Sequence, residues 1–232
     1  LCVRLYGMRI GILGGTGPAG SALGARLASV GYDVIIGSRS KDRAVEVCDA
    51  LKAKWPNLTL SVNGGDNDEA SACDVVVLAT PWDSAATTAK DHIDLLRGKV
   101  IISMANALVR VGHEFQPLLP PRGSVAAHIQ AAIPLSRVVA AFHHLPAKEL
   151  GHIGQPIDSD VLICSDDRDA IQIVSEIVER IPGCRPLDAG LLSNAMAIEA
   201  FTAVLLQLNV RYKTRVAPKL TGIRQPADQK KI

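Results

Sequence analysis

The stretch IGILGGTGPAG, residues 10–20, decides the fold of this chain. Its apolar start is typical of a short β-strand, its glycines of a tight turn, and the leucines that follow at a spacing of four residues of a helix. Gly15, Gly17 and Gly20 satisfy the pattern G-x-G-x-x-G, in which glycines turn the chain, let a pyrophosphate approach the backbone and let the helix lie close to the strand. A lone pattern of this kind is weak, and a glycine-rich turn without a ligand is the alternative.

The next apolar run, from Asp33 to Gly37, predicts a second strand about one helix length later. Ser38 and Arg39 follow it, at the place where a chain that binds NAD usually carries an acid for the ribose 2′-hydroxyl. An arginine and a hydroxyl suit a 2′-phosphate, and Lys41 and Arg43 would add positive charge. We therefore predict an NADP site. The alternative is that residues 38–43 are only a solvated loop and helix start.

Length and composition set the class of protein. With 232 residues, of which 48% are hydrophobic, the chain can form one large α/β domain with a modest appendage. A net charge of +2 without a basic stripe, and an aromatic content of 3%, argue against a nucleic-acid partner. No apolar run approaches the roughly 20 residues that cross a bilayer, so we expect no membrane segment and a soluble, cytoplasmic protein. Residues 1–7 are too short for a signal peptide, and we expect an upstream extension before a strand that begins near Met8.

Cysteine and histidine spacings predict no metal site. The cysteines form no C-x-x-C pair and lie in or beside apolar segments, which favours reduced thiols; they are Cys2, Cys48, Cys73, Cys164 and Cys184. His143 and His144 are adjacent, so in a strand they would point to opposite faces and would not share a metal ion.

Strands and helices alternate along the chain, which predicts a Rossmann-type doubly wound parallel sheet. We expect further strands over residues 58–62, 74–79, 99–103 and 137–142, and helices over residues 41–54 and 124–132. A turn from Gly64 should lead into a brief helix that ends near Ala72. The inner side of the helix over 41–54 should carry Ala44, Val45, Val47, Cys48 and Leu51.

Beyond residue 151 the pattern predicts a strand over 160–164, a helix over 168–180, a strand over 184–188 and a long helix over 189–212. We expect a Rossmann NADP-binding domain over residues 8–146 and a small C-terminal α/β lobe over residues 147–232. The apolar positions of the long helix exceed a narrow stripe, which indicates burial in the lobe or against a second subunit in a homodimer. The tail from Arg224 is polar and is expected to fray.

Ligands of open α/β sheets collect at the carboxyl ends of the strands. Thr80-Pro81-Trp82 and then Asn106 follow two expected strands at this edge. Pro81 would stiffen the turn, and Trp82 would lie along a cofactor or, alternatively, serve as a core or interface aromatic. The run FHHLPA, residues 142–147, ends the sixth expected strand and contains no charged acid or base.

Five segments in order along the chain resemble the NADPH-dependent coenzyme F420 reductases, also called F420:NADP oxidoreductases. They are GGTGPAG (14–20), GSR (37–39), TPW (80–82), FHHLPA (142–147) and RPLDAGLLSN (185–194), within a match from about residue 8 to 222. In that family a Rossmann domain holds NADP and a small C-terminal domain completes a cleft for the deazaflavin. The resemblance implies an oxidoreductase that transfers a hydride reversibly between NADPH and coenzyme F420.

The resemblance also implies roles for individual residues. It places Thr16, Gly17, Pro18 and Ala19 around the pyrophosphate and ribose, Ser38, Arg39 and Arg43 at the 2′-phosphate, Trp82, Asn106 and Ala147 near the nicotinamide half, and His143, Leu145 and Pro146 where the deazaflavin meets the nicotinamide. Two segments depart from the family's pattern. Residues 104–106 read MAN where some members have a more proline-rich turn, and Ala217-Pro218 stands where Gly-Ile is expected beside the deazaflavin contacts.

Hydride transfer between two stacked rings needs orientation and little water, and no protein nucleophile. We therefore expect no catalytic acid or base, with Leu145 and Pro146 setting the ring stacking by shape. His143 would position the ring or, alternatively, be a satisfied histidine at the end of a strand. Rival functions are an NADP-dependent reductase of a small metabolite, which usually needs a proton donor and a larger substrate domain, a flavin or ferric reductase, and a non-catalytic NADPH sensor.

Overall fold

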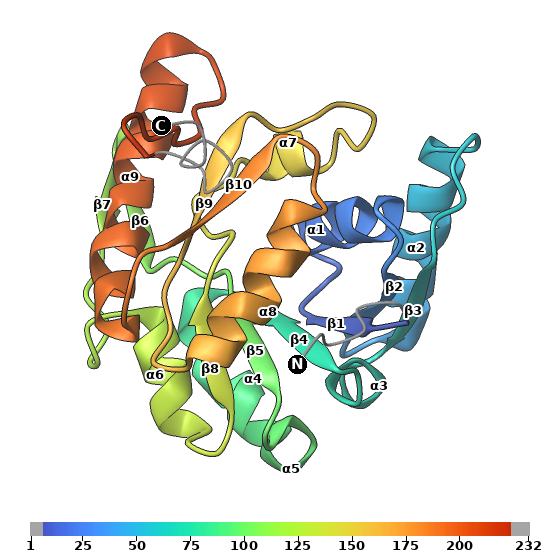
Figure 1. Ribbon diagram of the computed structural model, residues 1–232. Helices are drawn as coiled ribbons and strands as arrows, with labels where there is room; N and C mark the ends of the chain where they lie inside the picture. The colour runs from blue at the N-terminus through green and yellow to red at the C-terminus, as the bar shows by residue number, and fades with distance from the viewer. Residues whose placement is uncertain (1–6, 224–232) are drawn as a thin grey trace, which may run out of the picture.

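A parallel six-stranded sheet forms the centre of the protein in the computed structural model, which describes residues 7–223 (Figure 1). The strand order is β3-β2-β1-β4-β5-β8. The strands are β1 (Arg9–Leu13), β2 (Asp33–Ser38), β3 (Val62–Asp66), β4 (Val75–Leu78), β5 (Val100–Ser103) and β8 (Arg137–Ala140). The chain starts in the middle and winds outward in both directions, so the predicted doubly wound Rossmann fold is confirmed.

Helices cover both faces of the sheet because its inner strands are apolar on both sides. In β4, Val75 and Val77 belong to one hydrophobic core, and Val76 and Leu78 to the other. The first core lies under α1 (Pro18–Ser29), α2 (Lys41–Lys54) and α8 (Arg168–Glu179). The second lies under α3 (Asn67–Ser71), α4 (Trp82–Asp91), α5 (Ile93–Leu96) and α6 (Val125–Ala132).

A second, two-stranded parallel sheet joins the edge of the first. It consists of β9 (Ser159–Ile163) and β10 (Cys184–Asp188), the two strands expected beyond residue 151. Ala140 and Cys164 connect the two sheets through a pair of backbone hydrogen bonds of 2.9 and 3.1 Å. Apolar residues of α8 and of β9 belong to the same core as α1, so the predicted domains over 8–146 and 147–232 share one core where they meet. The boundary at residue 146 stays a prediction.

The remaining elements lie in two places, a short helix beside α1 and a hairpin beside the last helix (Figure 1). The short helix α7 (Ala147–Leu150) contacts α1, and the 3₁₀ turn η1 (Leu192–Asn194) leads into the long helix α9 (Ala195–Tyr212). Helix α9 packs against an antiparallel hairpin of β6 (Leu108–Val111) and β7 (Glu114–Pro117). No helix within residues 7–223 is long and apolar enough to span a membrane.

Two sequence predictions near β3 are wrong. The strand expected over 58–62 lies at Val62–Asp66, and Gly64 belongs to it and not to a turn. At Gly64 a side chain would place its Cβ 2.3 Å from the backbone nitrogen of Val45, so only glycine lets α2 lie this close to the strand. The helix over 41–54 is confirmed, with Ala44 and Cys48 buried, but Val45 is 41% exposed and does not belong to its inner side.

One further expectation is wrong, and one element has no counterpart among the predictions. The last helix begins at Ala195 and not at residue 189, and the hairpin of β6 and β7 was not predicted. Gly190 has a φ of +91°, a left-handed conformation that cannot continue a right-handed helix. Residues 1–6 of the expected extension, with Cys2, and the tail from Arg224 lie outside the described residues.

Candidate functional site

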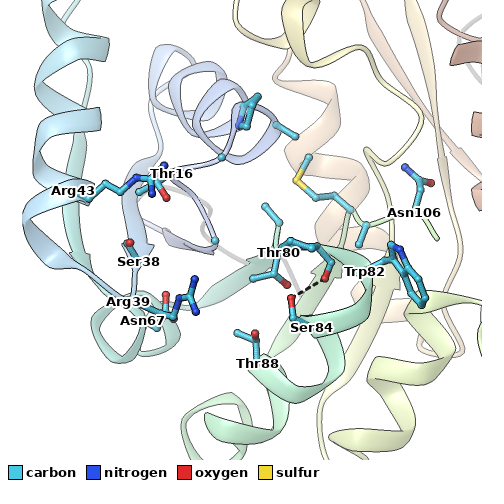
Figure 2. Close-up of a pocket in the computed structure, with 18 residues that line it drawn as sticks. Thr16, Ser38, Arg39, Arg43, Asn67, Thr80, Trp82, Ser84, Thr88 and Asn106 are labelled. Atoms are coloured by element: carbon cyan, nitrogen blue, oxygen red, sulfur yellow. Dashed lines mark hydrogen bonds between the residues drawn. The ribbon is translucent and has the colours of Figure 1, made fainter. Parts of the chain in front are cut away.

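A cavity of about 590 Å³ opens at the carboxyl ends of the central strands (Figure 2). We call it the first cavity. Loops after β1, β2, β4 and β5 supply its walls, as expected for an open α/β sheet. It brings together nine of the residues singled out in the sequence: Thr16, Gly17, Pro18, Ala19, Ser38, Arg39, Arg43, Trp82 and Asn106. Thr80 and Pro81, which were also expected at this edge, line it too, as do Gly14, Met104 and Ala105 from the segments over 14–20 and 104–106; no sequence pattern marks Asn67, Ala79, Ser84 or Thr88.

The glycine loop after β1 turns at Gly14, which has a φ of +70°. A Cβ on Gly14 would lie 2.7 Å from Cγ2 of Thr80, so this position requires glycine both for its conformation and for space. Gly15 lies behind the lining of the first cavity, where its N–H donates to the carbonyl of Gly37 at 3.1 Å. A Cβ on Gly20 would lie 2.8 Å from Cα of Gly15, which shows how closely α1 packs on the loop.

Helices α1 and α4 begin at the first cavity without side-chain caps. Gly17 precedes α1, Pro81 precedes α4, and neither side chain bonds the first turn. By contrast, α2, α6 and α8 are each capped by the side chain of Ser or Asp. Among the described residues the N–H groups of Ala19 and Gly20 have no hydrogen-bond acceptor. Such open N–H groups, together with the helix dipole, favour a phosphate at the start of α1.

Positive charge lies at the end of β2. The side chains of Arg39 and Arg43 are exposed and make no ion pair within residues 7–223. In Figure 2, Arg43 extends toward Thr16, and Arg39 lies beside Asn67. Lys41 does not line the first cavity; its ammonium group pairs with Glu69 at 2.7 Å, and this hydrogen bond raises the pKa of Lys41. Two guanidinium groups are thus available to an anion, and Lys41 is already paired.

Three buried polar atoms at this site have no hydrogen-bond partner among the described residues. They are Oδ1 of Asn67, Oγ1 of Thr80 and Oδ1 of Asn106. The side chain of Asn106 is fixed because its Nδ2 donates to the carbonyl of His143 at 2.6 Å. Buried polar atoms are normally paired, so these three indicate a polar ligand.

A second cavity, of about 220 Å³, adjoins the first. The two share Ala19, Met104 and Asn106. The turn from Phe142 to Ala147 forms one wall of the second cavity, which brings His143, Leu145, Pro146 and Ala147 together. The opposite wall comes from Thr202, Leu205, Leu206 and Asn209 of α9, and from Val216. No sequence motif marks these five residues. Four of them face the cavity through the packing of α9, and Val216 lies in the segment that follows this helix.

His143 and His144 lie in a tight turn and not at the end of a strand, because Phe142 adopts a φ of +64°. The argument that the two rings point to opposite faces is therefore wrong: their centroids are 4.9 Å apart, at 82° to each other. Within residues 7–223, no three His, Cys, Asp or Glu side chains are grouped as a metal site would require.

Both histidines are buried and neutral. Burial lowers the pKa of His144 to about 4, and its Nε2 accepts a hydrogen bond from the N–H of Leu162 at 3.2 Å. Burial and the neighbouring His144 bring the pKa of His143 well below 6.5, while a weak contact with the backbone of Ala141 opposes the shift. Neither ring nitrogen of His143 has a well-formed hydrogen bond within the described part of the chain. The second cavity is thus lined by uncharged groups.

Known proteins resemble this chain over most of its length. A family profile described as "NADP oxidoreductase coenzyme F420-dependent" matches residues 9–107, which include every residue that lines the first cavity. An F420-dependent NADP reductase of Methanocaldococcus jannaschii is 37% identical over 222 residues, which cover 94% of this chain and 97% of that protein. The chain belongs to the family of F420-dependent NADP reductases. A second F420-dependent NADP reductase, of Methanothermobacter thermautotrophicus, is 33% identical and covers 93% of this chain and 95% of its own.

The fold of this chain matches that of a solved structure from Arthrobacter sp. FB24, a proposed F420-dependent NADP reductase. The TM-score is 0.78 at 24% identity, covering 93% of this chain and all of the other. Both coenzymes of the family fit the residues present. The N–H groups and the two guanidinium groups that have no partner within residues 7–223 suit NADP in the first cavity, and the uncharged lining of the second suits a flat deazaflavin ring.

Proposed function

We propose that this chain transfers a hydride between NADPH and the deazaflavin coenzyme F420, in either direction. One observation carries the proposal: the first and second cavities meet at Ala19, Met104 and Asn106. A nicotinamide ring at the inner end of the first cavity and a deazaflavin ring in the second would lie face to face there. The two coenzymes supply the hydride donor and acceptor, and the protein supplies binding, orientation and exclusion of water.

The first cavity binds NADP in this proposal. Ser38, Arg39 and Arg43 hold the 2′-phosphate, and the start of α1 over residues 16–19 holds the pyrophosphate. Trp82 and Asn106 lie at the nicotinamide half. Because Nδ2 of Asn106 donates to the His143 carbonyl, its Oδ1 is left to accept a hydrogen bond from an amide of the ligand.

The second cavity holds the deazaflavin by shape. Leu145 is buried, and with Pro146 it stands where the ring would stack, beside Ala147. His143 is a positioning residue in this proposal, because a buried histidine whose pKa lies well below 6.5 is neutral at pH 7, and the N–H of a neutral imidazole is a weak acid. No residue of the chain is assigned as a general acid or base.

The rival functions gain no support from the site. A small-metabolite reductase needs a proton donor near the nicotinamide, and the titratable groups of the second cavity, His143 and His144, are both held neutral. A non-catalytic NADPH sensor would be favoured only by the departure from the family's pattern at residues 217–218. The carbonyl of Pro218 accepts hydrogen bonds from the N–H of Asp160 at 2.8 Å and the hydroxyl of Ser159 at 3.1 Å, so this segment is anchored beside the cavity.

A spectrophotometric assay of the purified protein with oxidised coenzyme F420 tests the proposal. We expect the deazaflavin absorbance to disappear rapidly with NADPH and slowly or not at all with NADH. No loss of absorbance with either nucleotide, from protein shown to bind NADPH, would overturn the proposal and favour a small-metabolite reductase or a sensor.

We also propose that the protein is a homodimer joined through α9. Phe201 and Val204, one turn apart on this helix, are 44% and 49% exposed, and Met196 and Val210 add to the exposed apolar surface. Sedimentation of the wild type at the mass of two chains, and of Phe201→Glu at the mass of one, would support this. A cytoplasmic location stays a prediction; the free thiols of Cys48, Cys73, Cys164 and Cys184 fit a reducing compartment.

A further inference from the structure

Arg26, in the last turn of α1, is buried with only 1% of its surface exposed. All five of its N–H donors are used, and every acceptor is a backbone carbonyl. Nε donates to Leu150 at 3.0 Å, Nη1 to Ile153 and Gln155 at 3.3 and 2.8 Å, and Nη2 to Glu149 and His152 at 2.9 and 2.8 Å. Burying a guanidinium group is costly unless its donors are all paired, so this arrangement exists only while the five carbonyls are held together.

The acceptors of Arg26 form one short segment. They begin in the last turn of α7 and continue through the turns that follow it, to Gln155. The last carbonyls of a helix lack partners within the helix and carry partial negative charge, and the Arg26 guanidinium satisfies them. Helix α7 has only four residues, so a contact at its end also fixes its start. Its first residue, Ala147, and the preceding Pro146 line the second cavity.

The same helix that carries Arg26 also forms the nucleotide site. Ala19 and Arg26 are seven residues apart, close to two helical turns, and therefore share one face of α1. Ala19 lines both cavities. Between these residues, Ala22 faces Gly151, which directly follows α7: a Cβ on Gly151 would lie 3.5 Å from the Cβ of Ala22, in van der Waals contact. Helices α1 and α7 are thus in direct contact, with the meeting point of the cavities at one end of the contact and Arg26 at the other.

We propose that Arg26 is a positioning residue for hydride transfer: it clamps α7 onto α1 and thereby sets the separation of the nicotinamide and deazaflavin rings. The inference rests on the proposed function. Arg26 touches neither ring; it acts through Ala147 and Pro146 on one side and through Ala19 on the other. The effect on rate is large because a misplacement of about 1 Å between reacting groups can cost on the order of 10²-fold.

Arg26→Lys and Arg26→Met in the full chain test this inference. Lysine keeps the charge but offers three donors for five carbonyls, and methionine offers none. In single-turnover reactions with NADPH and oxidised F420, we expect hydride transfer to fall roughly 10-fold in Arg26→Lys and roughly 10²-fold in Arg26→Met. The primary deuterium isotope effect, measured with NADPH deuterated at C4, should rise in both variants, while the dissociation constant of NADPH changes less than about 3-fold.

A control separates positioning from loss of stability. Ile129→Ala removes a fully buried side chain from α6, on the other face of the sheet, and should lower the melting temperature without changing the isotope effect. If Arg26→Met does not fold, Arg26→Lys decides, and Ala22→Val provides a further test because it pushes α7 away from α1 and leaves Arg26 in place.

Two outcomes overturn the inference. The first is an isotope effect and a hydride-transfer rate in Arg26→Lys equal to those of the wild type; the second is the same isotope effect in Ile129→Ala as in Arg26→Lys. A wild-type protein that transfers no hydride would instead overturn the proposed function, and this is seen before any variant is made.

Discussion

The two halves of the site are built on different physical grounds. The first cavity presents charge and open hydrogen-bond donors: Arg39 and Arg43 have no ion-pair partner within residues 7–223, and α1 begins without a cap. The second cavity presents buried, uncharged side chains, including two neutral histidines. We infer from this difference that the first cavity binds its ligand by electrostatic attraction and hydrogen bonds, and the second by the fit of apolar surfaces. Changes in the first should act on nucleotide affinity, and changes in the second on the rate of transfer.

The largest effect is expected in the first cavity, from the double variant Arg39→Ala/Arg43→Ala. Hydrogen bonds to a charged group contribute about 1.5–3 kcal/mol each, so kcat/KM for NADPH should fall roughly 10²- to 10⁴-fold. The value for NADH, which has no 2′-phosphate, should change little. Arg97→Ala removes an exposed arginine on another loop and serves as the control. An equal loss with NADH and NADPH would contradict the assignment of these arginines to the 2′-phosphate.

The next effect is on stability and comes from the burial of His144 beside the second cavity. Its pKa is about 4 in the folded protein and 6.5 ordinarily, so between these values the unfolded chain binds more protons. The contribution of neutral His144 is therefore present above pH 6.5 and is lost as the pH falls toward 4. At pH 4.5 this loss is about 2–3 kcal/mol.

Urea unfolding at pH 7.5 and 4.5 measures this effect in the wild type and in His144→Gln, whose amide oxygen can still accept from Leu162. Glu199 acts in the opposite direction, because burial raises its pKa to about 7, but it is common to both proteins and cancels in the comparison. The variant should lose less stability on acidification than the wild type. Equal losses would mean that folding does not lower the pKa of His144.

A smaller effect is expected from Leu145→Ala, which removes a buried apolar side chain from the wall of the second cavity. Single-turnover hydride transfer should fall about 10-fold, because the rings lose their fixed stacking, while the affinity for NADPH stays unchanged. Leu135→Ala, at a position 58% exposed, is the matched control. Weaker NADPH binding with an unchanged rate of transfer would assign Leu145 to the nucleotide site and contradict the distinction between the two cavities.

The smallest effect is expected at His143. Because the pKa of His143 lies well below 6.5, this residue should not change its protonation between pH 6 and 8. The rate of hydride transfer should therefore depend on pH in the same way in the wild type and in His143→Ala over this range. The variant should lose less than about 10²-fold in rate with both coenzymes bound. A loss on the order of 10⁴-fold or more would identify His143 as a direct proton-transfer group.

The contrast between the two halves also explains what could be predicted. The residues of the first cavity follow strand ends that have clear apolar patterns, and parallel strands bring their carboxyl ends to one edge. The sequence alone therefore determined the Rossmann fold, the helix over 41–54 and the order of the motifs. It misplaced β3, because Gly64-Gly65 looks like a turn when read locally, whereas in the fold Gly64 is the residue that lets α2 lie close to the strand.

Only the tertiary structure decided the wall of the second cavity opposite the turn over 142–147, and the contacts of Arg26. Thr202, Leu205 and Asn209 are more than fifty residues from the turn they face, and they carry no motif, since any apolar helix shows the same spacing. In the sequence Arg26 looks like any other arginine on a helix. Its five acceptors are backbone carbonyls, and because every residue has a backbone carbonyl, no residue type in the sequence marks them. Local patterns record which backbone a segment prefers, whereas contacts between distant segments depend on how the whole chain packs, and here the packing sets the distance between the two coenzymes.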